Sequence, residues 1–210
     1  MIDSAIHRIK NIHPEIPVKW ILSRLKYKKN KTLLDKKSAN FLNKNILRAS
    51  SLCQCEGAFR FLRIVSSSAE GTSLESGMTF KSASISKFLK GSEFALIMGV
   101  TAGNEIIMEI ESEIAAGRGA EAVILDAAAS EIADCAMDYI NEFAGKYILR
   151  EGLKLTKTRF SPGFGDFHLD AQKIIHKCLE MNEMGVEVTD SFQLVPEKSV
   201  TSVAGAVPIC

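Results

Sequence analysis

The longest regular pattern in the sequence is an alanine-rich stretch from Ala120 to Tyr147. Its apolar residues recur at intervals of three and four, which is the spacing of one core-facing stripe on a helix. The residues of this stripe are Leu125, Ala128, Ile132, Cys135, Tyr139 and Phe143. The small alanine side chains allow a neighbouring element to approach closely. We therefore predict one long helix that packs against the core of the domain.

A second stripe on the same predicted helix is acidic. It contains Glu131, Asp134, Asp138 and Glu142, again four or fewer residues apart. Like charges at positions i and i+4 repel by a few tenths of a kcal/mol, so this stripe needs solvent, a basic segment or a cationic ligand beside it. Solvent is the simplest of the three explanations.

Helical spacing also predicts shorter helices elsewhere, at residues 3–12, 18–27, 34–50, 84–89 and 168–181. Segments that favour β structure predict strands at 59–65, 94–100, 186–195 and 199–206. A Ser- and Gly-rich segment at 66–77 predicts a loop. Helices followed by adjacent strands joined by a tight turn indicate an α+β fold, with an antiparallel β-sheet packed with helices and an N-terminal helical arm.

The charge distribution divides the chain near the same loop. Residues 1–48 carry 12 Lys or Arg against 3 Asp or Glu, whereas the remainder carries 14 against 22. We therefore expect an N-terminal helical arm with the first strand (1–66) to be attracted to the body (67–210), the two forming one compact unit. The basic stretch 24–31 is interleaved with apolar residues, which favours a solvated helix surface over a nucleic-acid site.

Composition predicts the compartment. The mean hydropathy is +0.07, and no apolar run approaches the ~18 to 20 residues that cross a bilayer. The first ten residues lack the apolar core of a signal peptide. We expect a cytoplasmic protein with no membrane partner.

Two weak chemical motifs lie in the middle of the chain. Five cysteines without C-x-x-C spacing predict no zinc ribbon, but Cys53 and Cys55 leave open a thiol or soft-metal module, with two free thiols as the simpler interpretation. The Thr101–Asn104 segment between a strand and a helix resembles a phosphate cradle. The fuller Walker and dinucleotide patterns are absent, which disfavours that reading.

The segment Arg159–Asp166 carries a stronger signal. Arg159 offers a planar fork of donors that suits a carboxylate or phosphate. Pro162 fixes its own φ, and Gly163 permits the positive φ of a type II turn, flanked by two phenylalanines. Such a segment is able to hold an anionic group next to a flat one, with backbone amides directed at the ligand.

The continuation of this segment resembles a known family. The order R-x-S-P-G-F, a helix, G-V-E-V-T-D-S-F and P-E-K-S-V over residues 159–200 is similar to the reactivation domain of cobalamin-dependent methionine synthase, which shows R-x-x-P-G-Y, a short helix, L-T-[DE]-S-F and a Pro-x-x-S-V turn. Upstream, I-S-K-F-L-K-G at 85–91 and the alanine-rich helix look like free-standing members of the family.

The resemblance implies a site for S-adenosylmethionine. Arg159 matches the motif arginine and would take the ligand carboxylate, while Pro162 and Gly163 would contact the adenine and methionine portions. Phe164 stands where the family has tyrosine, so the ring is kept and the hydroxyl is lost. Asp134 and Glu151 would contact the amino group and the ribose. No metal site is implied.

The implied reaction is the reductive methylation of Co(II) cobalamin held by a partner. Because the chain has no D-x-H-x-x-G motif for cobalamin, it would dock on a separate corrinoid-binding methionine synthase module, with flavodoxin or another reductant as the electron donor. We expect no turnover from the chain alone. The alternative is a non-enzymatic docking protein of the same fold that binds no ligand.

Overall fold

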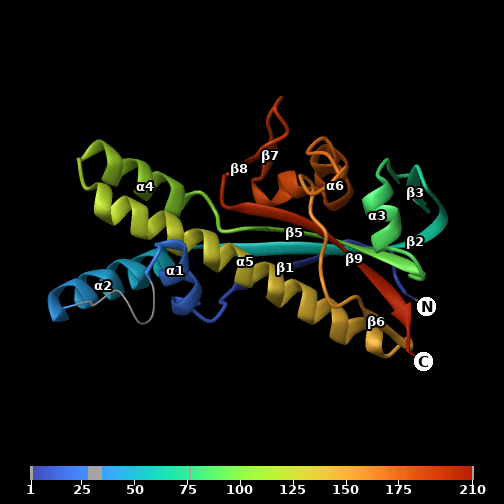
Figure 1. The fold of residues 1–210 in the computed structure, drawn as a ribbon, viewed down its shortest axis with the longest axis horizontal. Coiled ribbons are helices and arrows are strands. Elements are labelled where there is room, and N and C mark those ends of the chain that lie inside the picture. The colour runs from blue at the N-terminus through green and yellow to red at the C-terminus, as the bar shows by residue number, and fades with distance from the viewer. Residues whose placement is uncertain (1, 28–34, 76, 210) are drawn as a thin grey trace.

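The chain folds around an antiparallel β-sheet in the computed structural model, which describes residues 2–27, 35–75 and 77–209 (Figure 1). Within these residues the sheet has seven strands in the order β4-β3-β2-β5-β9-β6, and β1 pairs with β2. The strands are β1 (His7–Ile12), β2 (Cys55–Ser68), β3 (Gly71–Leu74), β4 (Thr79–Phe80), β5 (Phe94–Thr101), β6 (Leu153–Leu155) and β9 (Ser199–Pro208). A separate hairpin pairs β7 (Glu187–Val188) with β8 (Leu194–Val195). The predicted α+β class is confirmed.

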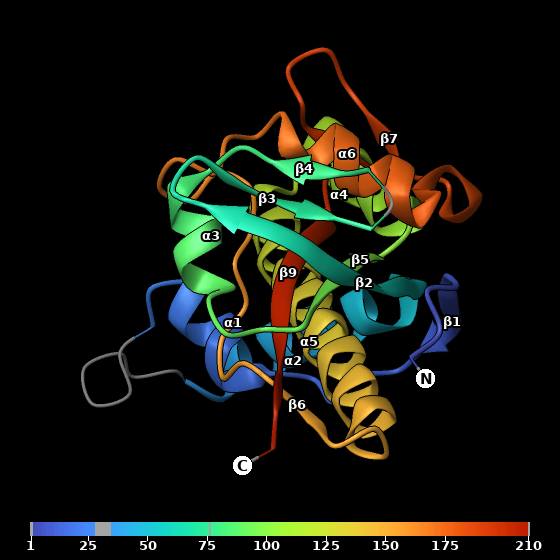
Figure 2. The ribbon, with the colours of Figure 1, turned by 90° about the vertical axis from the view of Figure 1, so that its right-hand side faces the viewer.

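Helices cover both faces of this sheet (Figures 1 and 2). The helices are α1 (Val18–Arg24), α2 (Lys36–Leu52), α3 (Ala83–Phe88), α4 (Glu105–Ala115), α5 (Gly119–Leu149), α6 (Ala171–Leu179) and the 3-10 helix η1 (Met181–Met184). The long helix α5 lies along one face, with α1, α2 and α4 packed around its N-terminal half. Helices α3 and α6 lie on the other face. No helix within the described ranges has both the length and the apolar character needed to cross a membrane.

The central strand β5 explains why the sheet carries a core on each side. All of its residues are buried, and successive side chains point to opposite faces. Leu96 and Met98 belong to the core under α5, whereas Ala95 and Ile97 belong to the core under α3 and α6. On β2, a Cβ placed on Gly57 would lie 2.8 Å from Ile140 Cγ1, so this glycine allows α5 to sit directly on the strand.

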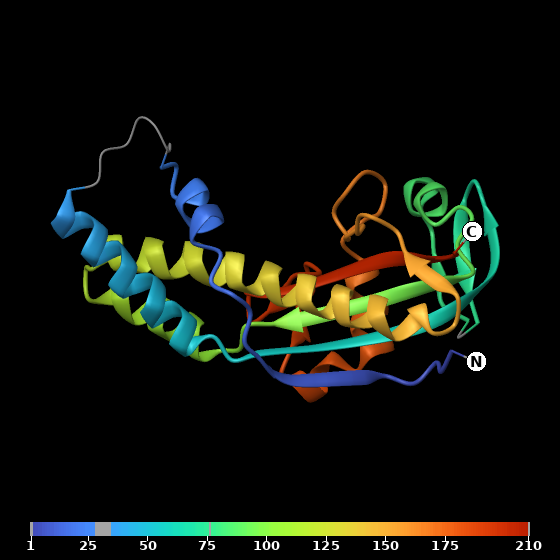
Figure 3. The same ribbon diagram turned by 90° about the horizontal axis from the view of Figure 1, so that it is seen from below.

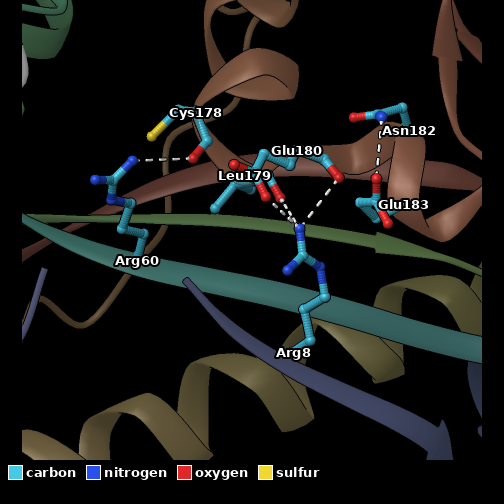
Figure 4. Close-up of polar contacts among 7 residues, drawn as sticks. All are labelled: Arg8, Arg60, Cys178, Leu179, Glu180, Asn182 and Glu183. Carbon is cyan, nitrogen blue, oxygen red and sulfur yellow. Dashed lines mark hydrogen bonds and ion pairs between the residues drawn. The ribbon is translucent and has the colours of Figure 1, made fainter. Parts of the chain in front are cut away.

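The basic arm is tied to the acidic body by ion pairs, as the charge distribution predicts. Arg24 Nε lies 2.6 Å from Glu131 Oε1, and Arg48 Nη2 lies 2.7 Å from the buried Glu113. On the opposite face, Arg8 Nη2 lies 2.9 Å from Glu180 Oε2 and also approaches the carbonyl oxygens of Leu179 and Glu180 (Figure 4). Cations at the C-terminal end of a helix complement its dipole, so Arg8 helps to hold α6 on the sheet.

The first predicted helix, at 3–12, is wrong, because this segment is strand β1. The register of β1 on β2 shifts between Ile9 and Ile12, and Asn11 has a φ of 53°. This irregularity places both isoleucines against the same core, although they are three residues apart. A bulged strand therefore reproduces the spacing of a helix.

The predicted loop at 66–77 is also wrong over most of its length. It contains the end of β2 and strand β3. The predicted division between the N-terminal arm (1–66) and the body (67–210) therefore lies inside β2. Hydroxyl groups hold this hairpin: Thr72 is buried and lies within hydrogen-bond distance of Ser67 and Ser86. The Ser and Thr residues of this segment therefore form part of the sheet and not a loop.

The third correction concerns 186–195, predicted as one strand and observed as the β7–β8 hairpin. Residues between β7 and β8 make the connection, in which Phe192 takes a φ of 64°. The other predicted helices and strands are present, with shifts at their ends, but residues 28–34 and Cys210 lie outside the described residues.

Candidate functional site

The Arg159 segment runs along the free side of strand β9, just after β6. Phe160 and Val203 exchange two backbone hydrogen bonds of 2.8 Å each. The Phe160 ring packs toward Phe88 and Phe167, in the core under α3 and α6. Because neighbouring residues in an extended segment point to opposite faces, Arg159 is directed toward α5.

Arg159 meets the acidic stripe of α5. Its Nη1 donates to Asp138 Oδ1, and the side chain of Asp138 is 68% exposed while that of Arg159 is 25% exposed. Asp134 lies one helical turn before Asp138 on the same stripe. Arg24 of α1, which lies beside α5 (Figure 3), approaches Asp134 with 3.8 Å between Nη2 and Oδ2. The structure therefore gathers two guanidinium groups and three carboxylates, counting Glu131.

The environment of Asp134 shows that these charges influence one another. Burial, followed by the negative charge of Glu131, raises the pKa of Asp134, while Arg24 and Arg159 act in the opposite direction. Asp134 is the half-buried member of the group, with a side chain 48% exposed. Arg159 and Asp134 are thus brought together, as the predicted site requires.

The Pro162–Gly163 turn has the geometry that its sequence predicts. Gly163 has a φ of 96°, and Phe164 N donates to Ser161 O at 3.3 Å. The amide of Gly163 donates to Phe167 O at 2.7 Å, so the amides of Gly163 and Phe164 are both used inside the turn. The expectation that these amides face a ligand is wrong for these two groups.

Phe164 projects from this turn. It is 65% exposed, and its ring centroid lies 6.5 Å from that of Phe160 in an edge-on arrangement. An exposed ring of this size, supported on one edge by another ring, leaves a face for a flat ligand group.

Asp166 fixes the turn to the N-terminal end of α3, a role that the sequence did not reveal. Its carboxylate accepts hydrogen bonds from Ser82 Oγ at 2.7 Å, from Ala83 N at 2.7 Å and from Ser84 N at 3.0 Å, at the start of α3. The side-chain hydroxyl of Ser84 first, then that of Ser82 and the backbone amides of Ser84 and Ala83, hold the pKa of Asp166 well below its ordinary value. A carboxylate at a helix N-terminus is the favoured polarity.

We expect Asp166→Asn to lower the melting temperature by several degrees at pH 7. The folded pKa of Asp166 is depressed, so its stabilisation is fully present above the unfolded value of about 3.9 and is lost as the pH falls below it. The gap between variant and wild type should therefore stay constant from pH 7 to about pH 5 and shrink as the pH falls from about 4 toward 2, measured by thermal melts. Asp170→Asn is the matched control, because Asp170 precedes α6 without a side-chain capping bond. Equal melts for Asp166→Asn and wild type at pH 7 would contradict this role.

Glu151 is not part of this cluster. It follows the C-terminal end of α5, 17 residues after Asp134, which corresponds to roughly 25 Å along a helix. There it lines a hollow of about 480 Å³ together with Phe143, Lys146, Tyr147 and Arg150. The structure thus separates Glu151 from the other predicted site residues.

The thiol hypothesis finds little support. Burial raises the pKa of Cys53 to about 12 and that of Cys55 to about 11, which disfavours reactive thiolates. Both line a polar hollow of about 660 Å³ that also contains Gly103 and Asn104. Within residues 2–27, 35–75 and 77–209, no group of three or more His, Cys, Asp or Glu side chains is arranged to hold a metal ion.

Comparison with solved structures finds a similar fold over almost the whole chain. No protein-family model matches the sequence, and no curated protein sequence matches it. The chain is similar to the crystal structure of the MetH reactivation domain bound to AdoHcy, with a TM-score of 0.68 and 16% identity over 98% of this chain and 79% of that one. At an identity this low, the similarity shows a shared fold but does not show a shared function. The chain therefore has the fold of the MetH reactivation domain.

Proposed function

We propose that the chain is the S-adenosylmethionine-binding reactivation subunit or domain of a cobalamin-dependent methionine synthase. The observation that carries this proposal is the meeting of Arg159 with the acidic stripe of α5, next to an exposed ring on a rigid turn. The fold shared with the MetH reactivation domain bound to AdoHcy supports the same ligand class. A cytoplasmic location remains our expectation.

The carboxylate, the ammonium and the adenine of S-adenosylmethionine would each have a partner in this arrangement. Only one nitrogen of Arg159 bonds to Asp138, and a guanidinium has five N–H donors, so others are left for the ligand carboxylate. Asp134 would accept the ammonium group. Pro162 and Gly163 would supply carbonyl oxygens to the adenine amino group, and Phe164 would pack on a flat face of the ligand.

The chemistry itself belongs to the ligand and to a corrinoid on the partner. When bound, the ligand would supply a methyl group from its sulfonium and leave as a neutral thioether, and the partner's corrinoid, reduced by one electron from flavodoxin or another donor, would accept that methyl group. The contribution of this chain would be to bind the methyl donor and to direct its sulfur toward the partner's corrinoid.

The second candidate is a docking protein of the same fold that binds no ligand. Two observations favour it: Phe164 lacks the hydroxyl of the family tyrosine, and Asp138 already pairs with Arg159. An exposed ion pair is worth only about 0.2 to 1 kcal/mol, so its rearrangement costs little and the first proposal is favoured.

Absorption spectroscopy tests the proposed function. A corrinoid-binding methionine synthase module in the Co(II) state is mixed with S-adenosylmethionine and an electron donor, with and without this chain. We expect conversion to the methylated corrinoid only when the chain is present. Co-elution with the module but no S-adenosylmethionine-dependent conversion would support the docking protein instead.

A further inference from the structure

The charges around Arg159 do not balance. Glu131, Asp134 and Asp138 contribute three negative charges, and Arg24 and Arg159 contribute two positive charges, so the cluster carries a net charge of −1 when all are ionised. Glu142, the next member of the stripe, is already paired with Lys146 at 2.7 Å. The uncompensated charge therefore lies within one or two helical turns around Asp138.

Asp138 is the member of this cluster that a ligand meets most readily. Its side chain is 68% exposed, against 48% for Asp134 and 16% for Glu131. It shares the guanidinium of Arg159, the group to which we assign the ligand carboxylate. When the ligand carboxylate binds Arg159, the ligand atoms next to that carboxylate therefore lie beside Asp138.

We propose that Asp138 is a specificity-determining residue, which makes this site select a methyl donor with a positively charged sulfur over the neutral thioether left after methyl transfer. This inference rests on the proposed function. S-adenosylmethionine carries a carboxylate, an ammonium and a sulfonium, so its net charge of +1 neutralises the cluster. S-adenosylhomocysteine has the same carboxylate and ammonium but no charge on sulfur, and leaves the cluster at −1.

The size of this preference follows from Coulomb's law at a partly exposed site. One charge acting on another across several ångströms, at an effective dielectric constant between those of protein and water, changes affinity by roughly three- to tenfold. The site would therefore bind S-adenosylhomocysteine more weakly than S-adenosylmethionine and release it in exchange for the methyl donor. This preference requires no contact between the protein and the methyl group.

The ratio of two dissociation constants isolates the charge on sulfur. Both ligands share the carboxylate, so any effect of Asp138 on Arg159 cancels when S-adenosylhomocysteine is compared with S-adenosylmethionine on the same variant. We expect calorimetry at low salt to give a wild-type preference for S-adenosylmethionine of roughly three- to tenfold, and Asp138→Asn to reduce it to within about twofold. At about 1 M salt, where the screening length falls to about 3 Å, the wild-type preference should shrink as well.

Two further variants make the test directional. Arg24→Gln removes a positive charge that pairs with Glu131 and approaches Asp134, so the preference should rise above that of the wild type. Glu142→Gln removes the same charge as Asp138→Asn from the same helix face, but one helical turn beyond the carboxylate that pairs with Arg159, so the preference should fall less than in Asp138→Asn. Thermal melts confirm that each surface variant is folded.

Each outcome decides between the two proposals. Binding of both ligands with equal affinity by the wild type, or a preference that survives Asp138→Asn, overturns this inference and leaves the proposed function standing. Failure of the wild type to bind either ligand overturns both. A preference lost equally in Asp138→Asn and Glu142→Gln assigns it to the general field of α5 and overturns the role of Asp138.

Discussion

Replacing Arg159 with alanine is expected to weaken the binding of S-adenosylmethionine by about ten- to a hundredfold. The loss of a charge-assisted hydrogen bond to a carboxylate costs about 1.5 to 3 kcal/mol, and each 1.4 kcal/mol is a factor of ten in affinity. Removal of Arg159 also leaves Asp138 without its partner, which adds repulsion against the ligand carboxylate. Calorimetric titration of the variant and the wild type measures the ratio directly.

Arg63→Ala is the control for this experiment. Arg63 lies on β2, where its guanidinium carbon is 4.7 Å from the centroid of the Phe94 ring, and it carries the same charge as Arg159 at a separate place on the sheet. Its removal should leave the affinity unchanged. Equal affinities of Arg159→Ala and wild type would show that the ligand, if bound, is held elsewhere.

Replacing Phe59 with alanine is expected to lower the free energy of unfolding by about 3 to 5 kcal/mol, the usual cost of deleting a large buried aromatic ring. Phe59 is fully buried on β2. Its ring stacks on His7 of β1 at 4.8 Å between centroids, and lies 6.0 Å from Phe143 and 6.4 Å from Tyr147 of α5. One side chain thus joins two strands to the helix that carries Asp134 and Asp138.

Val65→Ala on the same strand is the control, because Val65 is 67% exposed and its loss should change the stability by less than about 0.5 kcal/mol. Urea unfolding monitored by circular dichroism gives both values. A loss below about 1 kcal/mol for Phe59→Ala would mean that α5 is not held on the sheet by this cluster.

The sequence predicted those elements whose spacing reflects a single, regular environment. Helix α5 has buried alanines along much of its length, and strand β5 is buried on both faces, so both elements were predictable. The predicted core-facing stripe was wrong toward the end of α5, because Tyr139 and Phe143 are each 44% exposed. The Pro162–Gly163 turn was predictable for a different reason, because the conformations of proline and glycine are restricted locally.

The elements that the sequence did not predict depend on contacts between distant segments. Strand β1 carries isoleucines three residues apart, and only its bulged pairing with β2 distinguishes it from a helix. Hairpin β2–β3 is built from Ser and Thr, whose hydroxyl groups are satisfied across the sheet and by α3. Such pairings leave no periodic signal in a single segment.

The candidate site shows the same division. Arg159 and Asp134 were predicted from resemblance, and the acidic stripe was visible as a spacing that needed a positive neighbour. Arg24 and Asp138 were not predicted to meet there, because their roles arise only when α1 and the Arg159 segment pack beside α5. Glu151 was misplaced because it was assigned from the resemblance, although the predicted long helix already implied that it lies far from Asp134.

The most direct test of the account is a calorimetric titration of S-adenosylmethionine into the intact wild-type chain at low salt. The account predicts saturable heat with a stoichiometry of one ligand per chain, which Arg159→Ala diminishes. An absence of heat up to roughly millimolar ligand, a concentration that corresponds to about 4 kcal/mol of binding free energy, would contradict the existence of the site.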